Sequence, residues 1–133
     1  MKVKVAVVQS SPVMFDKYKT LQKVAEQVEE AARESPNLIL FPEAYIPGYP
    51  RGLSFGTAVG DRSPQGREMW LQYYDNSIEI PGDECIQLAN IAKKAKAYLV
   101  IGVIEKVPSG TLYCSLLYFS PKGKLIGLSL IHI

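Results

Sequence analysis

The strongest constraint on the fold is a strand pattern, a helix pattern and a second strand pattern that follow one another within residues 3–41. Valine alternates with lysine and alanine from Val3 and continues through Val8, which is typical of a strand that becomes buried on both faces. Residues 20–33 carry apolar side chains at helical spacing, and residues 38–41 form a short apolar run typical of a central parallel strand. This order predicts a βαβ unit. The expected buried stripe of the helix consists of Leu21, Val24, Ala25, Val28, Ala31 and Ala32.

A long segment without periodicity follows the second strand. Residues 42–66 are dense in Gly, Pro, Ser and Arg, which predicts an ordered loop of the kind that usually carries function. Trp70, Tyr73 and Tyr74 lie at helical spacing beyond it, and we expect them to pack in the core.

The rest of the chain extends the βαβ unit into a mixed α/β sheet. The Pro81-Gly82-Asp83 signal predicts a helix whose apolar side chains, among them Leu88 and Ala92, face inward. Strands are expected at residues 98–104, at residues 111–119 and from Lys124 onward, with antiparallel pairing across the turn at residues 108–110. Because the helices would cover one face of this sheet, the other face needs a second layer or a partner.

Composition and charge exclude several classes of protein. A chain of 133 residues suits one compact domain, and its net charge of 15 − 13 = +2 is too small to indicate nucleic acid as the main partner. The N-terminal residues lack the apolar core of a secretory signal, and no stretch approaches the roughly 20 apolar residues of a membrane span. We therefore expect a cytoplasmic protein with no membrane partner.

The sequence contains few of the cysteine and histidine side chains that commonly bind zinc or form disulfides. Cys85 and Cys114 are not closely spaced, and we interpret both as reduced thiols. The lone histidine, His132, supplies no zinc-ligand set, and we read it as a solvated residue without a role. We expect neither a metal nor an organic cofactor.

Residues 38–45, which read L-I-L-F-P-E-A-Y, resemble the strand and catalytic loop of the nitrilase superfamily of carbon–nitrogen hydrolases. The G-Y-P-R-G text at residues 48–52 extends the resemblance toward the nitrilase branch. The resemblance covers about residues 1–127, whereas residues 128–133 diverge. Other segments that resemble the family, in family order, are residues 5–10, 97–105, 111–114 and 119–123.

The resemblance implies a fold and a reaction. The fold would be part of an α-β-β-α sandwich, and the full-length form would be a homo-oligomer. The reaction would convert a small nitrile to a carboxylic acid and ammonia, through a thioimidate and a thioester on a cysteine. A glutamate, which corresponds to Glu43, would act as the general base, and a lysine would stabilise the negative charge developing on the substrate.

The residues themselves also make Glu43 a candidate. It lies just past the carboxyl end of a predicted parallel strand, where open α/β sheets bind ligands, and Pro42 ends the strand because it has no N–H for the ladder. Partial burial would suit the carboxylate to general-base catalysis. The simpler alternative is a solvated loop acid. Tyr49 and Arg51 are weaker candidates for substrate binding, because support of the loop explains them at least as well.

The chain departs from the family pattern after Gly127. The family continues with K-H-R-K, whose last lysine is catalytic, whereas Ile131 occupies that position here. The family nucleophile lies in a later segment that is not in this sequence. Cys85, in the first turn of a predicted helix, and Cys114, in mid-strand, are better explained as inert or core thiols. We therefore expect an incomplete domain and an inactive, truncated chain.

Alternative functions remain open. An amidase or ureidopropionase-like hydrolase is the nearest, and a non-catalytic interaction module belongs to a different class. A nucleotide-binding α/β domain fits the order of elements, but no G-x-G-x-x-G or P-loop motif follows Val8 or Phe41.

Overall fold

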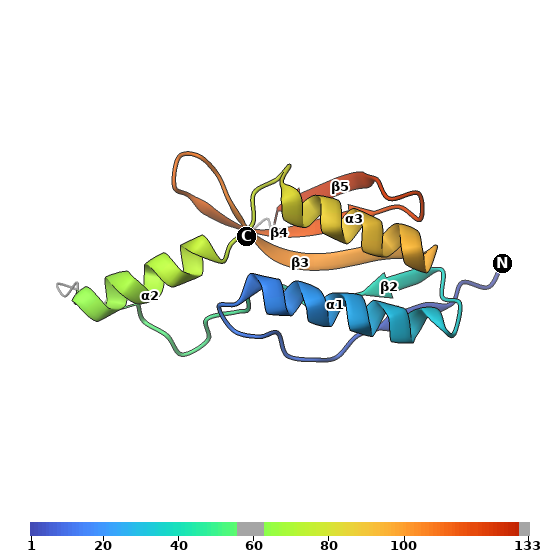
Figure 1. The fold of residues 1–133 in the computed structure, drawn as a ribbon, viewed down its shortest axis with the longest axis horizontal. Helices are drawn as coiled ribbons and strands as arrows, with labels where there is room; N and C mark the ends of the chain where they lie inside the picture. Colours follow the sequence, from blue (N-terminus) through green and yellow to red (C-terminus); the bar gives the residue numbers. More distant parts are fainter. Residues whose placement is uncertain (56–62, 131–133) are drawn as a thin grey trace.

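The computed structural model describes residues 1–55 and 63–130. The described part of the chain forms one five-stranded sheet with the strands in sequence order, together with three helices (Figure 1). The strands are β1 (Val5–Val7), β2 (Leu38–Leu40), β3 (Tyr98–Lys106), β4 (Leu112–Phe119) and β5 (Leu125–Leu130). The helices are α1 (Lys17–Ala32), α2 (Pro64–Asp75) and α3 (Asp83–Ala95).

The sheet is mixed, as the sequence predicts. β1, β2 and β3 run parallel, with Val5 opposite Leu38 and Leu38 opposite Tyr98. β4 pairs antiparallel with β3, and β5 pairs antiparallel with β4. Parallel strands require a long connection whereas antiparallel neighbours can be joined by a tight turn, which accounts for a helix between β1 and β2 and a short turn between β3 and β4.

Local signals in the sequence begin and end the two covering helices. The Asp16 carboxylate accepts a hydrogen bond of 2.9 Å from the backbone N–H of Lys19 and thereby caps α1. α3 has Asp83 and Glu84 in its first turn and two lysines in its last turn. These charges interact favourably with the helix dipole at both ends and stabilise the helix. Lys96 then ends α3 in a left-handed conformation, with φ of 55°.

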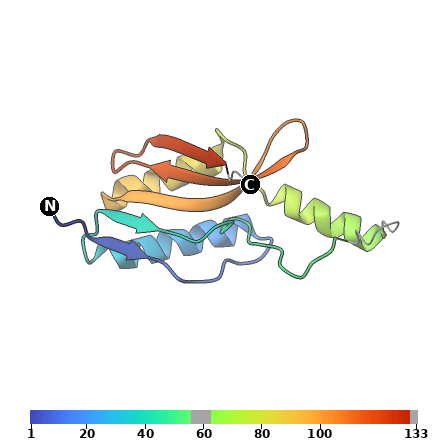
Figure 2. The same cartoon turned by 180° about the vertical axis from the view of Figure 1, so that it is seen from behind.

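α1 and α3 lie side by side over one face of the sheet (Figure 1). The main core lies between these helices and the sheet, and the predicted helix stripes provide Leu21, Val24, Val28, Leu88 and Ala92. Viewed from behind, the opposite face has none of the three described helices over it (Figure 2). The prediction of helices on one face of a mixed sheet is therefore confirmed.

The prediction that the first strand becomes buried on both faces is wrong. Val5 and Val7 are 49% and 69% exposed, whereas Ala6 between them packs against the main core. β1 is an edge strand, and every second side chain points to the face that no helix covers. An apolar strand is therefore buried only where another element covers it.

The expectation that the aromatic residues of the second helical segment lie in the core is only partly correct. Tyr73 is buried against Phe15 and Phe55, but Trp70 is 43% exposed. α2 extends beyond one end of the sheet, so only part of its surface meets the rest of the chain (Figure 1). Ser63 caps this helix through a hydrogen bond of 3.1 Å from the N–H of Gly66, and Pro64 occupies its first turn.

Candidate active site

Glu43 lies in a short loop, residues 42–46, that leaves the carboxyl end of β2 and packs along β3. The backbone N–H of Gly102 donates to the carbonyl of Pro42 at 3.1 Å, and the N–H of Tyr45 donates to the carbonyl of Gly102 at 2.8 Å. A third hydrogen bond, from the N–H of Ile104 to the carbonyl of Ile46, is 2.7 Å long. Both sides of Glu43 are therefore tied to the same strand.

The close approach of this loop requires glycine at position 102. A Cβ atom on Gly102 would lie 2.5 Å from the Cα of Glu43 and 2.5 Å from the backbone nitrogen of Ala44. Ala44 itself has φ of 48°, a left-handed conformation that a residue with a Cβ retains only where its surroundings hold it. The position of Glu43 thus depends on a backbone contact with no room for a side chain.

Tyr45 anchors the loop on the side of α1. Its ring is buried edge-on against Phe41, and its hydroxyl lies 2.6 Å from Ser10 Oγ and 3.1 Å from Gln27 Oε1. These contacts join the loop to the segment after β1 and to α1. The loop that carries Glu43 is therefore held by three separate elements of the fold.

Glu43 lines a cavity of about 480 Å³ at the end of the sheet where β2 finishes. This volume is within the range of small-molecule sites. Most of its lining is apolar or aromatic, and no lysine or arginine from the described residues contributes to it. Figure 2 shows that β1 and β2 point toward this end, from which α2 extends. The other residues that line the cavity are Tyr49, Pro50, Trp70, Tyr73, Ile104, Leu112, Tyr113, Cys114 and Leu130.

The structure brings two of the three predicted site residues to this cavity. Glu43 and Tyr49 both line it, whereas Arg51 is exposed and is not among the lining residues. Glu43 is itself an exposed residue, in contrast to the partial burial that we expected. Tyr49 is 65% exposed, so it lies at the rim of the cavity.

Cys114 lines the cavity, although the sequence predicted that it lies in the core. We expected a core thiol, but its side chain is only half-buried and its Sγ donates to Glu43 Oε1 at 3.6 Å. Burial raises the pKa of this thiol, and the negative charge of Glu43 and the hydrogen bond to it raise the pKa further. The signal that could have placed it is the strand register, because Cys114 pairs with Ile104, next to the loop of Glu43.

Cys85 lies away from this cavity. It is buried in the first turn of α3, where its Sγ is 3.7 Å from the carbonyl of Glu79. Burial raises the pKa of this thiol, which outweighs the helix-dipole effect considered from the sequence. Both cysteines are free thiols, and Ile131 and His132 lie outside the described residues.

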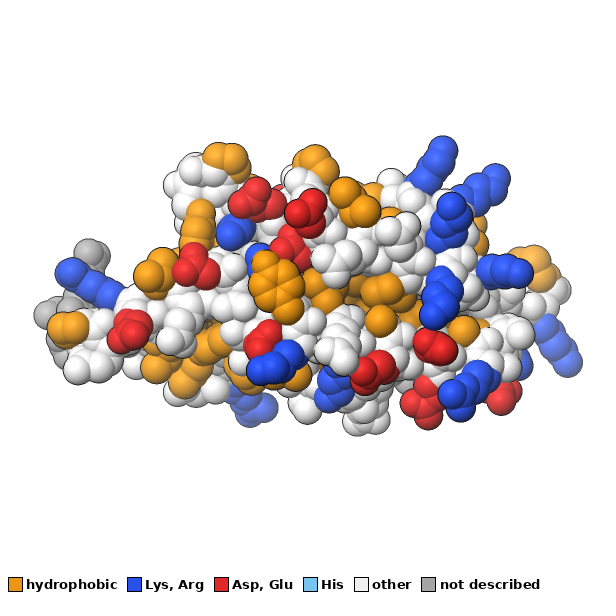
Figure 3. Space-filling model, in the orientation of Figure 1, with side chains coloured by type: hydrophobic (Ala, Val, Ile, Leu, Met, Phe, Trp, Pro, Cys, Tyr) orange, Lys and Arg blue, Asp and Glu red, His pale blue; other side chains and the backbone are white. Residues whose placement is uncertain are grey.

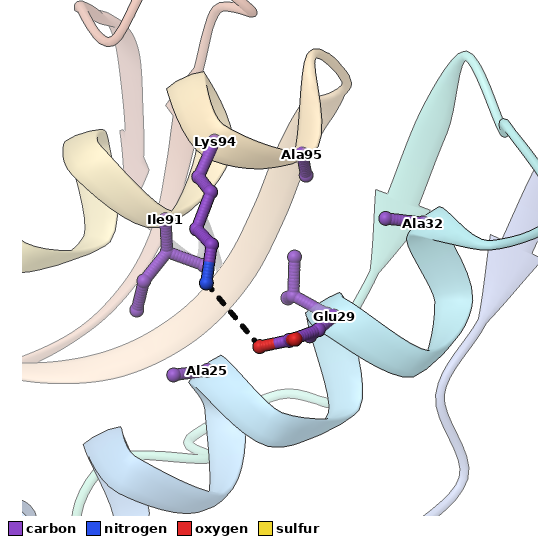
Figure 4. Close-up of a pocket in the computed structure, with 7 residues that line it drawn as sticks. Ala25, Glu29, Ala32, Ile91, Lys94 and Ala95 are labelled. Atoms are coloured by element: carbon purple, nitrogen blue, oxygen red, sulfur yellow. Dashed lines mark hydrogen bonds and ion pairs between the residues drawn. The ribbon is translucent and has the colours of Figure 1, made fainter.

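A second, smaller hollow of about 120 Å³ lies between α1 and α3. Figure 3 shows an apolar strip there with charged side chains on both sides, and Figure 4 shows small apolar side chains facing each other across the hollow. Among the described residues that line it, the ionic ones are Lys94 and Glu29, which bind each other at 3.3 Å. The described lining of this hollow therefore offers no unpaired acid or base, and the cavity at Glu43 is the better candidate site.

Two features are absent from the part of the chain that is described. Residues 1–55 and 63–130 contain no group of three or more His, Cys, Asp or Glu side chains that could hold a metal ion. None of the helices in these ranges combines the length and apolar character that a bilayer crossing requires.

Comparison with known proteins identifies the family. The family model of the carbon-nitrogen hydrolases matches residues 4–130. Nitrilase 1 of Arabidopsis thaliana is 46% identical over 125 residues, which are 94% of this chain and 36% of that protein. The aliphatic nitrilase of Sinorhizobium fredii is 46% identical over 122 residues, covering 92% of this chain and 39% of that protein.

The fold agrees with the sequence match. The crystal structure of Saccharomyces cerevisiae Nit3, a member of branch 10 of the nitrilase superfamily, superposes with a TM-score of 0.71 and 26% identity, covering 96% of this chain and 43% of that one. The chain thus spans somewhat more than a third of the length of the curated relatives described above. On the match to residues 4–130 and the shared fold, the chain belongs to the carbon–nitrogen hydrolase family.

Proposed function

We propose that this chain supplies the general base of a nitrilase-type hydrolase, and that Glu43 is this base. The supporting observation is the place of its carboxylate, which lines the cavity at the carboxyl end of β2 on a loop held by β3 and α1. The family membership and the 46% identity to two nitrilases favour a small nitrile as the substrate. Tyr49, at the rim, is a candidate substrate contact, and Arg51 is better explained as a loop residue.

The proposed chemistry starts with a proton transfer to Glu43. A thiol gives its proton to the carboxylate, and the thiolate adds to the nitrile carbon. The carboxyl group returns the proton to the nitrile nitrogen, which gives a neutral thioimidate and restores the base. Addition of one water molecule releases ammonia and leaves a thioester, and a second water molecule releases the carboxylic acid and restores the thiol. A cation must stabilise the developing charge on the substrate nitrogen and oxygen.

The described cavity contains a base and the Cys114 thiol but no cation. The raised pKa of Cys114 keeps it protonated, which makes it a poor nucleophile. We therefore propose that residues 1–133 alone do not hydrolyse nitriles, and that the catalytic lysine and the nucleophilic cysteine belong to further polypeptide of the family fold.

A chimeric enzyme tests the assignment. Residues 1–127 of this chain would replace the matching residues of Arabidopsis nitrilase 1, and ammonia release would be measured on a panel of small nitriles and the corresponding amides. We expect hydrolysis of nitriles by the chimera, and a loss of about 100-fold or more in Glu43→Gln. Glu34→Gln is the matched control, because its side chain is 83% exposed in an ion pair with Lys4.

Each outcome selects one function. Full activity of Glu43→Gln in the chimera would overturn the role of Glu43. Activity on amides alone would favour the amidase or ureidopropionase-like alternative. Ammonia release by the 133-residue chain itself would show that Cys114 suffices as nucleophile and that no further polypeptide is needed.

An interaction role is the second candidate, because the uncovered face of the sheet exposes apolar side chains. Val5, Val7 and Tyr98 on this face are 49%, 69% and 46% exposed. An uncovered apolar face of this kind favours association with further polypeptide, and we propose a cytoplasmic homo-oligomer for the full-length form. Light scattering at increasing concentration tests the association, and a strictly monomeric chain would contradict it.

A further inference from the structure

We infer that Cys114 is a positioning residue that holds the carboxylate of Glu43 by an S–H···O hydrogen bond to Oε1 and leaves Oε2 to accept the proton. This inference rests on the proposed role of Glu43 as a base. It assigns to Cys114 a function other than nucleophilic attack.

The first support is the contact itself. Sγ of Cys114 lies 3.6 Å from Oε1 of Glu43, and both side chains line the same cavity. A thiol is a weak donor to a neutral acceptor, but an ionised carboxylate strengthens the hydrogen bond. The backbone of the loop is already tied to Gly102, so the remaining freedom of Glu43 lies in its side chain. Cys114 is placed to restrict that freedom.

The second support is that Cys114 stays protonated. Burial, the charge of Glu43 and the hydrogen bond all raise the pKa of its thiol, so at neutral pH the sulfur retains the proton that it donates. A base that must take a proton from a reacting group needs one oxygen oriented and the other available. A thiol at Oε1 meets both needs without adding a positive charge that would weaken the base.

The third support comes from the surroundings of Cys114. The cavity is lined next to Cys114 by Ile104 of β3, Leu112 of β4 and Tyr73 of α2. Cys114 packs against the small cluster formed by Ala44, Tyr73 and Ile104, so its Cβ is held firmly while its sulfur faces Glu43. A thiol fixed in this way can orient the exposed carboxylate of Glu43 on its otherwise buried loop.

The first experiment measures the alkylation rate of each cysteine by iodoacetamide against pH in the 133-residue protein, with peptide mass spectrometry to separate Cys114 from Cys85. Glu43→Gln removes the negative charge next to Cys114, so we expect a lower titration midpoint and several-fold faster alkylation of Cys114 at mildly alkaline pH. Cys85, buried in the first turn of α3, is the internal control and keeps its rate. An unchanged Cys114 profile in Glu43→Gln would overturn the contact.

The second experiment tests whether the thiol orients the carboxylate. Side-chain couplings of Glu43, measured by NMR in the same chain, report its rotamer populations. Cys114→Ser keeps a donor and should retain one dominant rotamer, whereas Cys114→Val has a similar volume without a donor and should show averaging. Far-UV circular dichroism checks that each variant is folded. Averaging in the serine variant, or a single rotamer in the valine variant, contradicts a positioning role.

These results are independent of the proposed function. If the chimera is inactive but Cys114 responds to Glu43→Gln, the contact stands and the assignment of the reaction fails. If the chimera is active and Cys114 shows no response, only the positioning inference fails.

Discussion

The face of the sheet under α1 and α3 and the face that carries the candidate site are built from the same strands, but their side chains are enclosed to different degrees. Under the helices, Leu99, Ile101 and Val103 of β3 are at most 1% exposed and belong to one large core. On the other face, the site is supported by a small cluster of Ala44, Tyr73 and Ile104. The large core therefore stabilises the fold, whereas the small cluster and the Gly102 contact position the candidate base.

The largest expected effect lies in the covered face. Ile101→Ala removes a fully buried side chain between β3 and the helices, and we expect a loss of about 2–5 kcal/mol in the free energy of unfolding. Val7→Ala, on the uncovered face, is the matched control and should change it by less than about 0.5 kcal/mol. Urea denaturation followed by circular dichroism measures both. Similar losses for the two variants would show that a second copy of the chain covers the open face in solution.

A smaller change in stability, with a larger effect on the site, is expected at Gly102. Gly102→Ala places a Cβ 2.5 Å from the backbone of the Glu43 loop, so the loop must shift, at a cost of about 1–3 kcal/mol. Gly127→Ala is the control, because the three atoms nearest to its Cβ would all belong to the Tyr118 side chain, the first at 3.3 Å. Amide chemical shifts provide the measurement. We expect chemical-shift changes concentrated in residues 42–46 for Gly102→Ala. Unchanged shifts in these residues would contradict the close contact between Gly102 and the Glu43 loop.

The smallest expected effect is a pH dependence in the helical layer. Glu84 of α3 and Lys17 of α1 form an ion pair of 2.7 Å with both side chains largely enclosed. Burial opposes the charge of Glu84, but the hydrogen bonds that its carboxylate accepts from Lys17 and from its own backbone N–H, together with the charges of Lys17 and Lys106, outweigh burial and lower the pKa of the carboxyl below its ordinary value. A lowered pKa stabilises the fold above the ordinary carboxyl pKa, and this contribution is lost as pH falls through the folded-state value.

Thermal unfolding between about pH 6 and about pH 3 measures this contribution. The midpoint should fall with pH in the native protein and fall less steeply in Glu84→Gln. Glu29→Gln, which removes an exposed pair with Lys94, should follow the native profile. Parallel curves for the native protein and Glu84→Gln would show that the Lys17 pair does not stabilise the covered face.

Much of the fold could be predicted because its signals are local. Helical spacing placed Leu21, Val24 and Val28 in the core, and the apolar run before Pro42 identified β2. Burial of β1 could not be predicted in the same way, because Val5 and Val7 depend on which face of the sheet is covered. The position of Cys114 at the cavity depends in turn on the pairing of β3 with β4.

The sequence by itself determined the order and type of the elements, the loop that carries Glu43 and the resemblance to a family, because these properties are encoded by neighbouring residues. Only the tertiary structure decided which side chains share the cavity. Glu43 and Cys114 are 71 residues apart along the chain and meet because β2, β3 and β4 are adjacent in the sheet. Glycine at position 102 then lets the loop lie directly on β3, and this contact brings the carboxylate within reach of the thiol.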